Sequence, residues 1–421
     1  MKKILIKNAN VFDGRQPILK NNAKIVIEDN LVREIFCGDV CETGFDRVID
    51  AKGLTAIPGL TDAHVHVSVT APQDISRPDE IVARSVRYAY DMLMRGFTTV
   101  RDAGGITHGL KKSIDNGYLA GPRIFPSNNH ISQTCGHGDI RMSVAGERQH
   151  DGRYTSPAIA NRLTAIADGP AEMLRAVREQ FLLGASQIKL MAGGGISSYF
   201  DPLQTVQFTF EEMKTAVDAA ADYGTYVMAH LYTAESMKRA ARAGVRSFEH
   251  GMLMDEEAAR MMKDLDIWLM PGPQLERPVS ERILTRPGVA QKLEFVRRGI
   301  LQQVELVNKY DLKIVYGTDS FGDPKGAEVN QLGDFHYFKK HYGSFRGLVA
   351  ATGNANELFK LSTYQNPYPD GKIGVLEEGS YADILLVRGN PVEDLDILTD
   401  EANIRMIMKN AVIYKDLLNV E

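Results

Sequence analysis

The sequence predicts an α/β fold, a (β/α)8 TIM barrel with a small β-sandwich domain formed by the N- and C-terminal segments. Both ends of the chain show strand-like patterns, and the long middle segment alternates short apolar runs with helical patterns. The middle contains eight such apolar runs. A TIM barrel consists of eight strand–helix units in about 250 residues, which fits this segment.

The two ends of the chain are predicted to form one composite domain. Residues 1–58 contain the strand-like runs KILIKNANVFDG, AKIVIEDNLVREI and DRVIDAKGLTAIPG. Residues 366–421 contain GKIGVLEEGSYADILLVRG and NIRMIMKNAVIYKD. Because a short sheet cannot bury its apolar face alone, we expect these segments to meet in a β-sandwich beside a barrel domain of residues 59–365.

The apolar runs of the middle segment are the predicted barrel strands. They are LTDAHVHV, FTTVRDAGG, RIFPSNNHIS, ASQIKLMAGGG, TYVMAHLYT, VRSFEHG, IWLMPGP and KIVYGTDS. Helix-like stretches such as PAEMLRAVREQFLLG and TAESMKRAARAG lie between them and end in glycine, the usual residue at a helix C-terminus. A doubly wound open sheet is the alternative, but no strand–GxGxxG–helix opening supports it.

Composition excludes several classes of protein. The 421 residues carry 49 Lys and Arg and 54 Asp and Glu, a formal net charge of −5, and 44% of them are hydrophobic. This balance argues against disorder and lacks the basic excess of a nucleic-acid binder. No apolar stretch reaches about 18 residues, and the alternating N-terminus is typical of a strand rather than a signal peptide. Three cysteines make no disulfide framework, so we expect a cytoplasmic protein.

Side chains that bind metals follow the apolar runs at their C-terminal ends, the face where TIM barrels carry out catalysis. They are His64, His66, Lys189, His230, His250 and Asp319. His64 and His66 are two residues apart on a predicted strand, so they point to the same side and could share one ion such as zinc. Each residue alone has a structural explanation, such as a helix N-cap for Asp319. Their occurrence together at one rim favours a metal site.

The lysine in this set requires an explanation of its own. Four imidazoles and one carboxylate suffice for two metal ions, but cations about 3.5–4 Å apart need an anionic bridge. An ammonium group has no acceptor to offer a metal. Carboxylation by CO₂ would convert Lys189 into a carbamate with one oxygen for each ion. The sequence therefore predicts N-carboxylated Lys189 as a bridging ligand.

These motifs resemble those of a known family. DAHVH, QIKLMAGGG, MAHLYT, SFEHG and YGTDS, together with the β-rich ends, resemble the amidohydrolase superfamily of the binuclear metal type. TTVRDAGG, SQTCGHGD and KLMAGGG are most similar to the imidazolonepropionase-related branch that includes prolidase-type Xaa-Pro metallodipeptidases. The resemblance implies a hydrolase with two divalent metal ions, for which zinc is the expected metal.

The resemblance also implies a role for each ligand. The more buried ion would be bound by His64, His66 and Asp319, the more exposed one by His230 and His250, and carboxylated Lys189 and a hydroxide would bridge them. Asp319 would be catalytic, because it can accept the proton of the attacking hydroxide and deliver it to the leaving amine.

Further residues are candidates for substrate contacts. His137, in CGHGD, and Tyr232, two residues after His230, are the predicted substrate-binding residues, with support of the metal ligands as the alternative for both. The loop that contains Asp201 could fold over the substrate or be a plain loop. Arg141 could bind a substrate carboxylate, but a solvated surface position is the expected role.

The predicted function is hydrolysis of a C–N amide bond in a small substrate, and a dipeptidase acting on Xaa-Pro is the first choice. An N-acyl amino acid or cyclic amide amidohydrolase is the alternative. A mononuclear deaminase would not need a carboxylated lysine, and a non-catalytic barrel scaffold should have lost ligands. The expected partner is a small-molecule substrate, with no nucleic acid and no membrane. We also expect a homo-oligomer, with residues 268–300 as a candidate contact surface.

Overall fold

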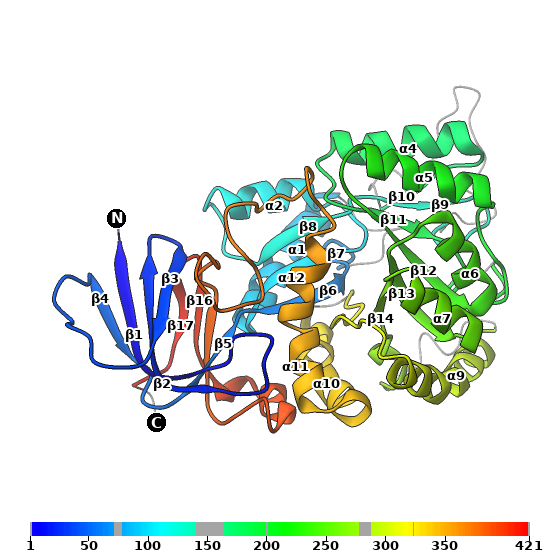
Figure 1. The fold of residues 1–421 in the computed structure, drawn as a ribbon. Helices are drawn as coiled ribbons and strands as arrows, with labels where there is room; N and C mark the ends of the chain where they lie inside the picture. Colours follow the sequence, from blue (N-terminus) through cyan, green and yellow to red (C-terminus); the bar gives the residue numbers. More distant parts are fainter. Residues whose placement is uncertain are drawn as a thin grey trace.

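The computed structural model describes residues 2–70, 78–139, 163–198, 201–277, 288–322 and 324–419. Figure 1 shows a β-rich part that holds both ends of the chain and a larger part in which helices surround parallel strands. The two ends of the chain therefore meet in space.

Strands from both terminal segments form one eight-stranded sheet in the order β17-β16-β15-β5-β1-β2-β3, with β4 paired to β1. Their bounds are β1 Lys3–Val11, β2 Lys20–Glu28, β3 Leu31–Phe36, β4 Arg47–Asp50, β5 Thr55–Pro58, β15 Ile384–Val387, β16 Ile404–Lys409 and β17 Val412–Asp416. The two segments join where β15 runs antiparallel to β5, with Ile384 opposite Pro58 and Val387 opposite Thr55.

This composite sheet has an apolar core of its own. Alternate residues of β1, such as Ile4 and Ile6, pack with Ile384 and Leu386 of β15 in a cluster that uses only residues up to 56 and from 376 onward. Leu31 of β3 also forms an isolated antiparallel bridge with Tyr381, which lies just before β15. The strands form one hydrogen-bonded sheet, so the division into two packed layers stays a prediction.

The middle of the chain forms parallel strands in two sheets, β10-β9-β11-β12-β13-β14 and β6-β7-β8. Their bounds are β6 Leu60–Val65, β7 Phe97–Asp102, β8 Arg123–Pro126, β9 His130–Ser132, β10 Thr164–Ile166, β11 Ile188–Met191, β12 Val227–Thr233, β13 Ser247–Leu253 and β14 Trp268–Met270. Every residue of β6 and β7 is buried, as expected of parallel strands that are covered on both faces.

Isolated bridges connect the ends of these two sheets. Ile314 bridges Leu269 of β14, and Ser320 bridges Val65 of β6, so the eighth apolar run lies between β14 and β6. This run forms bridges rather than a regular strand, and Asp319 within it has a φ of 51°, outside the β region. The fold is thus α/β with parallel sheets, and closure into one barrel stays a prediction.

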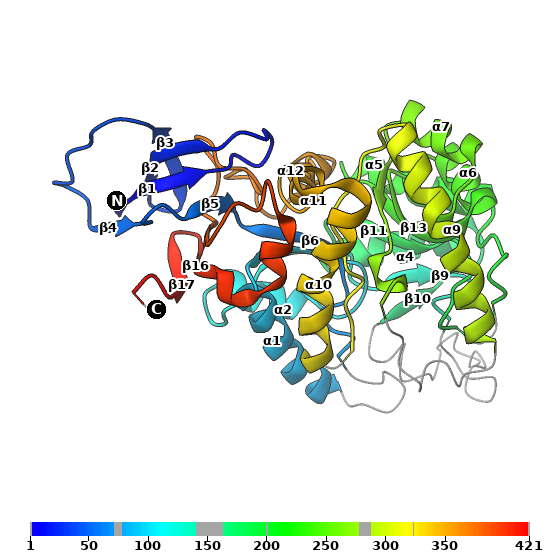
Figure 2. The same ribbon diagram turned by 90° about the horizontal axis from the view of Figure 1, so that it is seen from below.

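The helices of the described residues are α1 Pro78–Met94, α2 His108–Asp115, α4 Pro170–Leu182, α5 Phe210–Asp222, α6 Ala234–Ala243, α7 Glu256–Asp264, α9 Val289–Lys309, α10 Pro324–Tyr342, α11 Ser344–Ala350 and α12 Gly353–Phe359, with short 3-10 turns at Pro273–Leu275, Leu395–Thr399 and Glu401–Asn403. Figure 2 shows α5, α6, α7 and α9 together on the side of β13. Thr209 and Glu212 form a capping box that fixes the start of α5. Gly244 ends α6 in the left-handed conformation, which glycine adopts without strain.

Among the helices of the described residues, none combines the length and the apolar character needed to cross a bilayer.

Candidate active site

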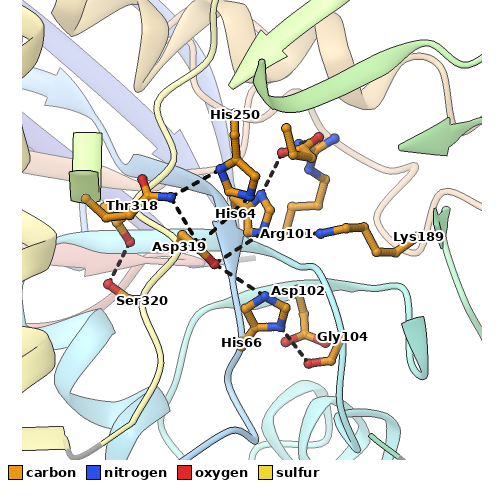
Figure 3. Close-up of polar contacts among 12 residues, drawn as sticks. His64, His66, Arg101, Asp102, Gly104, Lys189, His250, Thr318, Asp319 and Ser320 are labelled. Atoms are coloured by element: carbon orange, nitrogen blue, oxygen red, sulfur yellow. Dashed lines mark hydrogen bonds and ion pairs between the residues drawn. The ribbon is translucent and has the colours of Figure 1, made fainter. Parts of the chain in front are cut away.

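The predicted ligands come together at the C-terminal ends of the parallel strands. His64, His66 and Asp319 each offer a ligand atom, and these atoms all lie within 4.8 Å of one another. Asp319 Oδ1 is 3.4 Å from Nε2 of His64 and 3.4 Å from Nε2 of His66. Figure 3 shows the Asp319 carboxylate between the rings of His64, His66 and His250.

Two further predicted ligands lie beside this group. The Lys189 ammonium, on β11, is 3.4 Å from Nε2 of His64. His250, on β13, places Nε2 4.0 Å from Asp319 Oδ2, and its ring centroid is 5.3 Å from that of His64. Side chains from β6, β11, β13 and the eighth run therefore converge on one point.

His230, on β12, completes the predicted set. Its ring centroid is 4.8 Å from that of His250 and 5.1 Å from that of Tyr232. Its Nε2 is buried and has no hydrogen-bond partner among the described residues. A buried polar atom without a partner is costly, so this nitrogen suits a ligand such as a metal ion.

A buried ion pair supports His64 from behind. Nδ1 of His64 donates to Glu249 Oε2 at 2.7 Å, and Arg101 binds the other oxygen of that carboxylate at 2.9 Å. Ser247 Oγ also donates to Glu249 Oε1 at 2.7 Å. With its proton on Nδ1, His64 has a free lone pair on Nε2, the atom that faces Asp319 and Lys189. This is the tautomer that coordination of a metal through Nε2 requires.

Glu249 and Arg101 are not among the site residues that the sequence predicts. A signal was available, because each is a charged residue inside a predicted buried strand, and a buried charge needs a partner. The side chains of both residues are fully buried. The sequence alone does not show that Arg101 on β7 contacts Glu249 on β13 across the interior.

Other ligands are also held by hydrogen bonds. Nδ1 of His66 donates to the Gly104 carbonyl at 3.1 Å. Gln274 Nε2 lies 3.1 Å from both His250 Nδ1 and Asp319 Oδ2, so it ties these two side chains together. Such contacts fix the direction in which each ligand faces.

Backbone strain marks two of the predicted ligands. His250 has a φ of 79° and Asp319 has a φ of 51°, both in the left-handed region that residues other than glycine rarely occupy. Such conformations cost about 1–3 kcal/mol and cluster at functional sites. On a regular strand, the side chains of neighbouring residues face opposite sides. Glu249 and His250 are neighbours but both lie next to His64, which the left-handed conformation of His250 makes possible.

Burial sets the charge states. It lowers the pKa of His250 to about 4 and holds the pKa values of His64 and His230 well below their usual range. Burial also lowers the pKa of Lys189 to about 8, although the nearby carboxylates act in the opposite direction. Burial alone would raise the pKa of Asp319, but the surrounding histidines hold it well below its usual range. Neutral imidazoles beside an ionised carboxylate are the donor set that divalent cations require.

The two predicted substrate-binding residues lie on the His230 side of the cluster. The His137 ring stacks on that of His230, with centroids 4.2 Å apart and an interplanar angle of 16°. Tyr232 stacks on His250 at 5.4 Å and is buried, which raises the pKa of its hydroxyl. Asp201 is buried and lies 3.6 Å from Nδ1 of His137, so its loop reaches this side of the cluster. Arg141 lies outside the described residues.

Known proteins are similar to this chain over most of its length. A family model described as the amidohydrolase family matches residues 55–413. An ochratoxinase from Aspergillus niger is 30% identical over 419 residues, which cover 94% of this chain and 83% of that protein. A solved prolidase complexed with N-methylphosphonate-L-proline is 30% identical, with a TM-score of 0.90 over 99% of this chain and 100% of that chain. A Xaa-Pro dipeptidase with bound methionine is 30% identical, with a TM-score of 0.84 over 98% of this chain and 100% of that chain.

Proposed function

We propose that this chain, which belongs to the amidohydrolase family and is a hydrolase of amide bonds, is a metal-dependent dipeptidase that cleaves Xaa-Pro substrates. The observation that carries the proposal is that Asp319, three histidines and Lys189 converge on one point from β6, β11, β13 and the eighth run. Likeness over nearly the whole chain to a prolidase and to a Xaa-Pro dipeptidase supports the choice of substrate.

The site is proposed to hold two divalent ions, with zinc as the expected metal. One would be bound by His64, His66 and Asp319 and the other by His230 and His250, with N-carboxylated Lys189 between them. The unpartnered Nε2 of His230 and the short distance from Lys189 to His64 support this division. When bound, such ions would supply an activated water and would polarise the scissile carbonyl.

The protein's own residues would then handle protons and orientation. Asp319, held ionised by its surroundings, would accept a proton from the attacking water and return it to the leaving amine. Tyr232 keeps its proton at neutral pH, so its hydroxyl could donate to the substrate carbonyl oxygen. His137 is proposed as a second donor on the same side, next to His230.

The fold is proposed to complete this site. The parallel strands would close into an eight-stranded barrel of residues 59–365, since the eighth run already bridges β14 and β6. Residues 1–58 and 366–421 would form the sandwich domain. We also predict a homo-oligomer, which light scattering on the purified chain would test. A cytoplasmic location stays a prediction as well.

The test is a substrate screen with zinc-loaded protein. Xaa-Pro dipeptides, other dipeptides, N-acyl amino acids and cyclic amides are compared by kcat/KM. We expect turnover of Xaa-Pro and its loss in His230→Ala and Asp319→Ala, while the exposed controls His336→Ala and Asp311→Ala keep the wild-type rate. Full activity in the first two variants would refute the assignment of the site.

A second candidate has an observation in its favour. The similarity to an ochratoxinase over 94% of the chain favours a substrate outside the Xaa-Pro dipeptides. The candidates are the two classes that the sequence predicts as the alternative, N-acyl amino acids and cyclic amides. Higher kcat/KM for those classes in the same screen would replace the dipeptidase proposal.

The bridging role of Lys189 needs its own experiment. Lys189→Ala should lose both activity and most bound metal, and short carboxylic acids should restore part of both, because a carboxylate can replace the carbamate. Metal content that is unchanged in this variant would contradict the bridging role. Lys263→Ala, which removes a surface ammonium, is the matched control.

A further inference from the structure

A lysine on α9 binds a loop that borders the candidate active site. Lys292 Nζ donates to three backbone carbonyls: Gly195 at 2.9 Å, Ser198 at 3.1 Å and Asp201 at 2.7 Å. An ammonium has three donors, and all three can be used here. Carbonyl dipoles that point at one spot repel each other, so the cation stabilises this loop conformation.

The same loop positions a buried carboxylate. Asp201 Oδ2 accepts from the Gly195 amide at 2.8 Å and from Gln207 Nε2 at 3.2 Å. It also lies 3.6 Å from Nδ1 of His137. The loop held by Lys292 therefore presents a carboxylate to the ring of His137.

The loop also surrounds the imidazole of His137. Ser198 Oγ is 2.8 Å from Nδ1 of His137, and the His137 amide donates to Gln207 Oε1 at 2.8 Å. Gly195 lies so close that a Cβ atom there would be 1.9 Å from the ring. The His137 ring also stacks on the ring of His230, and the two ring centroids are 4.2 Å apart.

We propose that Lys292 is a positioning residue: by binding the backbone carbonyls of Gly195, Ser198 and Asp201, it fixes the His137 ring beside His230. Lys292 does not itself touch the proposed ligands. The consequence for catalysis rests on the proposed function, in which His137 contacts the substrate. A small displacement of such a group lowers the rate of turnover by up to about 100-fold.

The first experiment measures the loop without any substrate. Lys292→Met keeps the aliphatic stem and removes the three donors, and Lys309→Met removes the same charge from the exposed end of α9. Hydrogen exchange of the Gly195 amide should become about tenfold faster in Lys292→Met and stay at the wild-type rate in Lys309→Met. Equal protection in wild type and Lys292→Met would overturn the proposal.

The second experiment measures the ring of His137. Labelling by diethyl pyrocarbonate, quantified on peptides, should modify His137 several-fold faster in Lys292→Met, with the exposed His336 as the internal reference. Unchanged labelling of His137 in that variant counts against the proposal. Neither of these two experiments requires a substrate, so both still test the role of Lys292 if the protein hydrolyses no Xaa-Pro dipeptide. Absence of that hydrolysis would refute only the proposed function.

The third experiment links position to turnover. With an Xaa-Pro dipeptide as the probe, kcat should fall about 10- to 100-fold in Lys292→Met while zinc content is unchanged. Lys292→Arg should restore part of kcat, because it keeps the charge but not the compact three-donor geometry. Gly195→Ala should lower kcat similarly, because its methyl group displaces the ring. A wild-type kcat in Lys292→Met, with a faster-exchanging loop, would refute the positioning role.

Discussion

The buried pair of Arg101 and Glu249 gives the sharpest test of how the site is supported. Both side chains are fully buried and 2.9 Å apart, and the carboxylate also holds Nδ1 of His64. Arg101→Met would leave Glu249 with hydrogen bonds from Ser247 and His64 but without a balancing charge. Breaking a buried pair by removing one partner costs about 3–5 kcal/mol, because the remaining charge stays uncompensated.

The assay is denaturant unfolding of Arg101→Met, Glu249→Gln and the double variant. Each single variant should lose about 3–5 kcal/mol in the free energy of unfolding. The double variant should lose about 1–3 kcal/mol less than the sum of both, because no isolated charge remains. Arg298→Met removes an exposed arginine that pairs with Glu294, and it should cost less than about 1 kcal/mol.

The same variants test the link to the metal site. Since Glu249 fixes the tautomer of His64, Glu249→Gln should weaken zinc binding about 10- to 100-fold in a chelator competition. If Arg101→Met were no more destabilising than Arg298→Met, the buried pair would not be the support that the geometry indicates. Additive losses in the double variant would equally contradict the argument.

Three further outcomes are expected. Removing divalent metal with a chelator should abolish hydrolysis, and added zinc should restore it; a metal-free chain of full activity would contradict the proposed chemistry. Thr209→Ala removes the capping box of α5 and should lower the free energy of unfolding by about 1 kcal/mol in denaturant titrations, without change in kcat. Gly299→Ala places a methyl group 2.3 Å from the Met252 carbonyl, where α9 packs on β13. The resulting strain of about 1–3 kcal/mol should outweigh the gain in helix propensity of about 1 kcal/mol, so the thermal midpoint should fall. An unchanged midpoint would show that α9 can shift to accommodate the methyl group.

Much of the fold followed from periodicity. Seven of the eight apolar runs contain strands, because a parallel strand covered on both faces must be apolar along its length. The eighth run also contains apolar residues but forms only bridges, and Asp319 near its end adopts a left-handed backbone conformation. Composition does not encode that departure from the strand.

The sequence by itself determined which residue types could bind a metal and on which rim they would lie, because strand ends and the spacing of His64 and His66 are local properties. Only the tertiary structure decided how they are held. The proton on His64 is set by Glu249, 185 positions away, and that carboxylate is held in turn by Arg101 across the interior. Hydrogen bonds between distant segments depend on three-dimensional packing, which no local pattern records.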